Sequence, residues 1–160
     1  HTASRRQRQM CIRDRLKLAS DHKMPVFLHN REAFKDFYSI LKKYFSNLPG
    51  GIVHCFTGSK SELVSFLDLG LYIGITGWVC DERRGADLNS LLKFIPKDRL
   101  IIETDAPYLI HRNLKSKTKH NINTPMNLPH IAEHIANVRG ENVIEMAEYT
   151  TENFKNLFTL

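Results

Sequence analysis

The sequence predicts an α/β fold built on a parallel β-sheet. Four short, continuously apolar segments recur along the chain, and stretches with a helical spacing of apolar residues lie between them. Apolar runs without polar alternation are typical of parallel strands covered on both faces. Alternation of strand and helix is the pattern of βαβ units. The 160 residues suit one domain, and no linker-like segment divides them.

The predicted elements follow in a regular order. The strands are residues 25–28, 51–53, 71–75 and 100–102. Helical spacing covers residues 34–41, 63–67, 88–92, 128–138 and 142–158. Gly70 is a C-cap candidate for the second helix, and Pro96 ends the third. Residues 111–125 contain few apolar anchors and are predicted to form a loop.

Composition excludes several classes of protein. No apolar run approaches the roughly 18 residues that span a membrane, and the N-terminus lacks the apolar core of a signal peptide. We therefore expect a cytoplasmic protein without a membrane partner. The three cysteines are an odd number without metal-knuckle spacing, which argues against a disulfide framework. Cys55 is placed in an apolar strand and is interpreted as small core filler.

The net charge of +6 comes mostly from the first fifteen residues. That segment holds five of the 23 basic and one of the 17 acidic residues, so the remainder carries 18 and 16, a net of +2. It shows no apolar periodicity, and it resembles one translated frame of a sequencing adapter. We predict that residues 1–15 are a non-native leader that packs poorly, and that residues 16–160 form the domain. A basic arm that binds nucleic acid is the alternative.

Ligand-type side chains fall at the carboxyl ends of three predicted strands. His29, His54 and Asp105 each occupy such a position. These strand ends converge on one face of a parallel barrel, where two imidazoles and a carboxylate can bind a divalent metal. Alternation places Glu103 on the same face as Asp105, so both are candidate catalytic carboxylates. The alternatives are structural histidines and solvated acids.

Four segments resemble motifs of the TatD family in the same order: residues 24–31, 53–58, 72–85 and 100–109. The last two segments are most similar to those of bacterial members. The resemblance runs from about residue 16 to the end. It implies about the C-terminal four strands, with their helices, of a TIM-type (β/α)₈ barrel. It also implies a metal-dependent 3′–5′ exodeoxyribonuclease associated with DNA repair, acting on single-stranded DNA, with RNA as an alternative substrate.

The resemblance assigns His29, His54 and Asp105 as metal ligands and Arg31 as a candidate phosphate contact, although a solvated arginine is an equal alternative. The expected metal is Mg²⁺, with Mn²⁺ or Zn²⁺ as alternatives. The sequence indicates no protein partner. Two departures stand out: the family's Gly-Glu motif, which supplies another ligand, is absent, and its Asn-Glu-Pro motif reads Asn123-Thr124-Pro125. A related amide or ester hydrolase and an inactive truncated fragment remain rival hypotheses.

Overall fold

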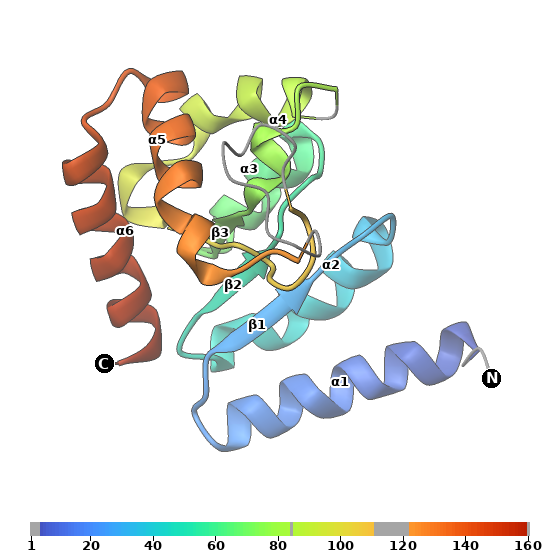
Figure 1. Ribbon diagram of the computed structural model, residues 1–160. Helices are drawn as coiled ribbons and strands as arrows, with labels where there is room; N and C mark the ends of the chain where they lie inside the picture. The colour runs from blue at the N-terminus through green and yellow to red at the C-terminus, as the bar shows by residue number, and fades with distance from the viewer. Residues whose placement is uncertain (1–3, 84, 111–121, 160) are drawn as a thin grey trace.

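The computed structural model describes residues 4–83, 85–110 and 122–159. A four-stranded sheet forms its centre, with helices around it (Figure 1). The strands are β1 (Val26–His29), β2 (Gly51–His54), β3 (Tyr72–Ile75) and β4 (Leu100–Ile102). The α-helices are α1 (Arg5–Asp21), α2 (Phe34–Tyr44), α3 (Lys60–Asp68), α4 (Ala86–Leu91), α5 (Leu128–Arg139) and α6 (Val143–Phe158). Short 3₁₀ turns cover Phe45–Asn47, Gly77–Cys80, Leu92–Phe94, Lys97–Arg99 and Pro125–Asn127.

All strand pairs are parallel, and the order in space, β1-β2-β3-β4, is the order in sequence. This confirms the predicted α/β class with a parallel sheet. A doubly wound sheet reverses its strand order at a switch point, whereas consecutive order is the arrangement of a TIM-type barrel. The register pairs His29 with His54, so both predicted ligands end neighbouring strands at the same level.

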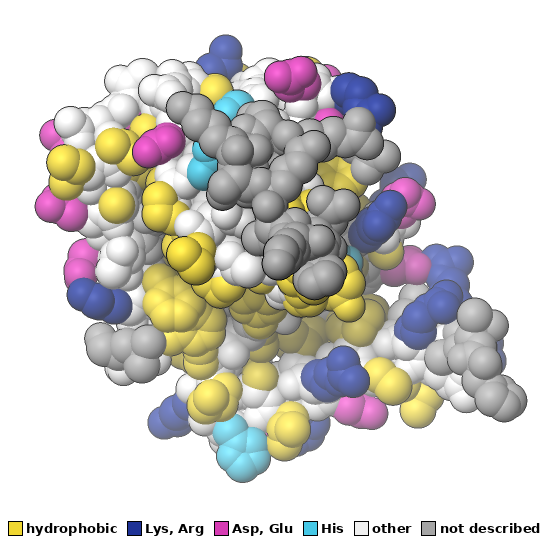
Figure 2. All heavy atoms as spheres, in the orientation of Figure 1, with side chains coloured by type: hydrophobic (Ala, Val, Ile, Leu, Met, Phe, Trp, Pro, Cys, Tyr) yellow, Lys and Arg dark blue, Asp and Glu magenta, His cyan; other side chains and the backbone are white. Residues whose placement is uncertain are grey.

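The two faces of the sheet are covered unequally. One face holds the main core, which includes Leu28, Val53 and Ile73. The other carries a small cluster of Ile52, Ile101 and Leu157, and Phe27 on this side is 59% exposed. Hydrophobic side chains gather in the hollow between α1 and the rest of the molecule (Figure 2). Since alternate residues of a strand share a face, His29 and His54 lie on this open face.

A helix that the apolar pattern did not indicate, α1, covers most of residues 1–15. The helix begins at Arg5, where Ser4 and Gln7 form a capping box, and Arg5 bonds to Asp36 of α2 at 2.8 Å. Ile12 packs partly against the core. Apolar periodicity did not reveal this helix, because a capping signal and residues that favour helix suffice for an exposed helix. The prediction that residues 1–15 pack poorly stays a prediction. The non-native origin of this segment stays a prediction.

Asn123 fastens the loop that follows β4. Its side chain is buried at 2% exposure. The amide nitrogen donates to the carbonyls of Thr104 and Tyr108, both at 2.7 Å, and the amide oxygen accepts from Asn127. These bonds join the two ends of a turn that contains Asp105. Of the predicted loop 111–125, residues 111–121 lie outside the described residues, and Pro125 begins a 3₁₀ turn.

Substitution of Asn123 by alanine should destabilise the chain by about 1–3 kcal/mol, because it leaves buried carbonyls without a donor. The midpoint of urea unfolding measures this loss. Asn127→Ala is the matched control, since it removes one side-chain bond to Asn123 and leaves both bonds to the loop carbonyls intact. Equal midpoints for the two variants would contradict the assignment.

In the part of the chain that the structure describes, no helix combines the length and apolar content that crossing a membrane requires.

Candidate metal centre

His54 is the centre of the candidate site. It ends β2, and its two ring nitrogens face two different carboxylates. Nδ1 lies 2.8 Å from Oε2 of Glu103, and Nε2 lies 3.0 Å from Oδ1 of Asp105. The hydrogen bond to Glu103, followed by the charges of both carboxylates, raises the pKa of His54 despite the opposing effect of burial.

Glu103 acts on the site through His54. Its Oε2 accepts from His54 Nδ1 and also from the backbone N–H of Cys55 at 3.0 Å. A carboxylate on Nδ1 fixes the tautomer that leaves Nε2 able to bind a cation, as in carboxylate–histidine–metal arrangements. These contacts are those of a positioning residue, and the expected role of Glu103 as a catalytic carboxylate stays a prediction.

Gly74 makes room for this carboxylate. A Cβ at Gly74 would lie 2.5 Å from Oε2 and 2.7 Å from Oε1 of Glu103. Gly74 stands in β3, between the strand of His54 and the strand that leads to Glu103. The side chain of Glu103 therefore reaches His54 across a strand position that has no side chain.

We expect Gly74→Ala to weaken divalent-metal binding by about 10–100-fold, the effect typical of losing an outer partner of a ligand. The added methyl would push the Glu103 carboxylate off His54. Isothermal titration with Mn²⁺ measures the affinity. If the mechanism is correct, Gly74→Ala adds little to Glu103→Gln in a double-mutant cycle; additive losses would show that the glycine acts elsewhere.

A pH dependence follows from the raised pKa of His54 in the metal-free chain. The charged imidazole contributes stability below its ordinary pKa of 6.5, and that contribution is lost as pH rises through the higher folded-state value. Thermal unfolding from pH 5 to 9 should therefore show a loss of stability above about pH 6.5. Glu103→Gln should flatten this part of the profile, and an unchanged profile would refute the coupling.

Asp105 and Cys55 both adopt left-handed backbone conformations, with φ of 57° and 49°. Such conformations are uncommon outside glycine and collect at functional sites. Cys55 is half-buried and lies past the end of β2, so its interpretation as core filler is wrong. Burial raises the pKa of its thiol. One ligand atom each from His54, Cys55 and Asp105 lies within 4.8 Å of the others.

His29 lies near the cluster of His54, Cys55 and Asp105 but is not part of it. Its ring centroid is 5.9 Å from that of His54, and the side chain is exposed. The structure thus brings His54, Glu103 and Asp105 into direct contact, and it places His29 beside them on the same face.

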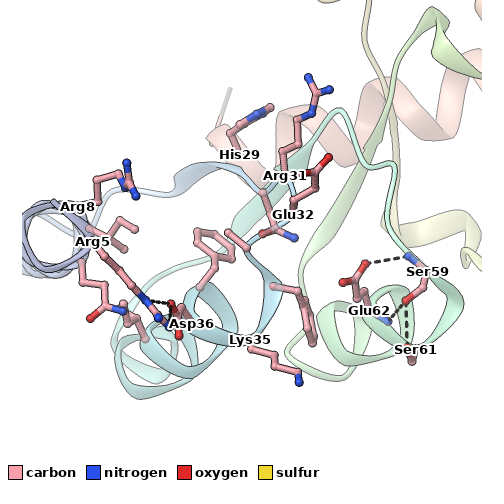
Figure 3. Close-up of a pocket in the computed structure, with 17 residues that line it drawn as sticks. Arg5, Arg8, His29, Arg31, Glu32, Lys35, Asp36, Ser59, Ser61 and Glu62 are labelled. Carbon is pink, nitrogen blue, oxygen red and sulfur yellow. Dashed lines mark hydrogen bonds and ion pairs between the residues drawn. The ribbon is translucent and has the colours of Figure 1, made fainter. Parts of the chain in front are cut away.

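Two adjoining cavities open onto these residues. One of about 480 Å³ is lined by His29, Arg31, Cys55 and Asp105. The other, about 1060 Å³, shares His29 and Arg31 and extends along α1 and α2 (Figure 3). Arg5 and Arg8 of α1 also line the second cavity. Among the described residues, Arg31 forms no ion pair with an acid.

The fold and this metal-type site agree with the comparisons to known proteins. The family model described as TatD related DNase matches residues 1–159, and the chain belongs to this family. The curated relatives include a "3′-5′ ssDNA/RNA exonuclease TatD" from Rahnella sp. (strain Y9602), 52% identical over 91% of this chain and 55% of the relative. The same name is carried by an Escherichia coli (strain K12) protein, 49% identical over 89% of this chain and 55% of the relative.

Solved structures show the same fold. The chain is similar to YJJV, a TatD homolog from Escherichia coli K12, with a TM-score of 0.82 and 28% identity over 92% of this chain and 54% of that one. An uncharacterized amidohydrolase from Saccharomyces cerevisiae has a TM-score of 0.82 at 20% identity, over 98% of this chain and 60% of that one. The chain spans about half the length of the curated relatives that it matches, 55% for the Rahnella protein.

Proposed function

We propose that the chain belongs to a metal-dependent phosphodiester hydrolase that acts as a 3′–5′ exonuclease on single-stranded DNA, and on RNA as a second substrate. The observation that carries the proposal is His54 held between Glu103 and Asp105 at the carboxyl ends of parallel strands. The names of relatives about 50% identical support the same reaction and substrates.

The donor set fits a divalent cation. His54 Nε2 and an Asp105 oxygen, 3.0 Å apart, are close enough to share one ion, and His29 is the proposed third protein ligand from the neighbouring strand. Imidazole and carboxylate together suit several first-row metals, while Mg²⁺ prefers oxygen. We propose Mg²⁺ as the ion, with Mn²⁺ or Zn²⁺ as alternatives. A divalent ion at this position supplies Lewis acidity toward a phosphoryl oxygen.

Other side chains are proposed to orient the metal ligands and to contact the substrate. Glu103 orients His54, and Asn123 holds the turn that presents Asp105. We propose that Arg31 contacts a phosphate, because it lines both cavities and a guanidinium can donate two parallel bonds to phosphate oxygens. Contacts of this kind bind the backbone without reading the bases, which suits an exonuclease that passes along a strand.

We further propose that residues 16–160 correspond to about the C-terminal four strands of a (β/α)₈ barrel, and that residues 1–15 are a non-native leader. Support for the partial barrel comes from the consecutive strand order and the thinly covered face around Phe27. An apolar groove of about 600 Å³, lined by Ile101, Leu128 and Phe154 among others, adjoins the edge strand β4. Unpaired strand edges and exposed apolar faces are costly in an isolated domain.

The proposed reaction is tested with a single-stranded oligonucleotide labelled at its 3′ end. Mg²⁺-dependent release of labelled mononucleotides before any shortening from the 5′ end supports the exonuclease. Turnover of an ester or amide panel without nucleotide release would instead favour the rival hydrolase. Because a partial barrel is proposed, the assay uses both the 160-residue chain and a completed protein, in which the N-terminal half of the Escherichia coli relative precedes residue 16.

A further inference from the structure

The thiol of Cys55 belongs to the same cluster as the proposed metal ligands. Its Sγ, a ring nitrogen of His54 and a carboxylate oxygen of Asp105 lie within 4.8 Å of one another. Ligand atoms around one tetrahedral Zn²⁺ stand about 3.3–3.8 Å apart, given metal–ligand distances of about 2.0–2.3 Å. Side-chain shifts of about 1 Å would therefore let the three ligand atoms bind one ion.

The backbone directs this thiol toward the cavity. Cys55 has a φ of 49°, and its N–H donates to the same Glu103 oxygen that holds His54. Cys55 and Asp105 both line the cavity of about 480 Å³. The carboxylate of Glu103 thus fixes both the imidazole of His54 and the residue that follows it.

The buried hydroxyl of Thr76 lies within hydrogen-bonding distance of the Cys55 sulfur. Thr76 is 1% exposed, and its Oγ1 lies 3.3 Å from Cys55 Sγ. The same Oγ1 accepts from the backbone N–H of Trp78 at 3.4 Å, so the hydroxyl proton remains available to donate to the sulfur. Ligands at metal sites are commonly oriented by such hydrogen bonds from a second layer of residues.

We propose that Cys55 becomes a protein ligand when the ion is thiophilic, so that His54, Cys55 and Asp105 together bind Zn²⁺ or Co²⁺ with one position left open. This inference rests on the metal site of the proposed function and adds selectivity among metal ions to it. Thiolate favours Zn²⁺ and Co²⁺ over Mg²⁺, which prefers oxygen ligands. On binding, the thiol proton passes to solvent and the sulfur–metal bond forms without any change of oxidation state.

Cobalt absorption provides the test on the metal-free 160-residue chain. Co²⁺ bound by His54 and Asp105 gives visible ligand-field bands, and a thiolate ligand adds a sulfur-to-cobalt charge-transfer band in the near ultraviolet. We expect both in the unmodified chain. Cys55→Ser should remove the charge-transfer band, keep the visible bands, and weaken Zn²⁺ binding by at least about tenfold. Mn²⁺ binding should change by less than about twofold, since a thiolate adds little for that ion.

Two further measurements keep the result independent of a single variant. Thr76→Val should shift the charge-transfer band and weaken Zn²⁺ binding while leaving Mn²⁺ binding unchanged. In the unmodified chain, Zn²⁺ should protect Cys55 from alkylation. Cys11→Ser is the matched control, because Cys11 is an exposed thiol on α1 and its loss should leave the spectrum unchanged.

The possible failures separate the two proposals. Visible cobalt bands that vanish in Asp105→Ala, without any charge-transfer band, would overturn the role of Cys55 and leave the proposed metal site standing. A charge-transfer band that survives Cys55→Ser would likewise overturn it. Cobalt binding that is insensitive to both His54→Ala and Asp105→Ala would overturn the metal site of the proposed function together with this inference.

Discussion

Replacing Asp105 with asparagine is expected to slow the Mg²⁺-dependent release of nucleotides by the completed protein. The loss should exceed the effect of about 10–100-fold that is typical when an outer partner of a metal ligand is substituted. The amide keeps the shape of the side chain and removes the negative charge that attracts the cation. Asp105 also holds Nε2 of His54 at 3.0 Å, so the loss affects both proposed ligands. The release rate and the Mn²⁺ affinity should fall together.

Asp98→Asn is the matched control for this substitution. Asp98 lies in the 3₁₀ turn that precedes β4, and its side chain is 72% exposed. Among the described residues, its one ion pair is with its neighbour Arg99 at 3.3 Å. Its replacement should leave both the rate and the metal affinity unchanged. An Asp105→Asn protein with full activity would show that hydrolysis does not depend on this carboxylate.

The second large effect concerns completion of the barrel. We expect the 160-residue chain to release nucleotides at least about a hundredfold more slowly than the completed protein, because misplacement of reacting groups by about 1 Å costs this much. The resemblance implies a further ligand in a Gly-Glu motif that precedes the matched segments, so we expect the cation to have fewer charged contacts in the 160-residue chain. Both proteins are compared on single-stranded DNA at saturating Mg²⁺.

Stability should change in the same direction. If the chain is part of a barrel as proposed, closing the barrel would bury the face around Phe27, which is 59% exposed in this structure, and the groove beside β4. Buried apolar area stabilises by about 25 cal/mol per Å², so the completed protein should unfold at a higher urea concentration. Equal specific activity and equal unfolding midpoints would contradict the proposal of a partial barrel.

The sheet could be predicted from sequence because each strand is a local apolar pattern. The predicted segments 25–28, 51–53, 71–75 and 100–102 fall on β1 to β4 within one residue at either end. The helices α2, α3, α5 and α6 follow from apolar spacing in the same way. The amino-terminal helix α1 was missed, because exposed helices need no apolar stripe when capping and intrinsic propensity suffice.

The candidate site could be predicted in part. Strand-end positions pointed to His54 and Asp105, and the alternation rule put Glu103 on their side of the sheet, as its contact with His54 confirms. The clamp formed by Asn123 could not be foreseen, since it joins residues up to 19 apart through a buried amide. The proximity of Cys55 to Asp105 depends on the left-handed backbone conformation of both residues, which no sequence pattern predicts.

The most direct test of the metal centre is anomalous X-ray diffraction from crystals of the completed protein soaked in Mn²⁺. We expect one strong peak between His54 Nε2 and the carboxylate of Asp105, at about 2.0–2.3 Å from each. Glu103 should remain bonded to Nδ1 of the same ring. A well-ordered, saturated crystal whose only manganese peaks lie away from both side chains would contradict the metal centre described here.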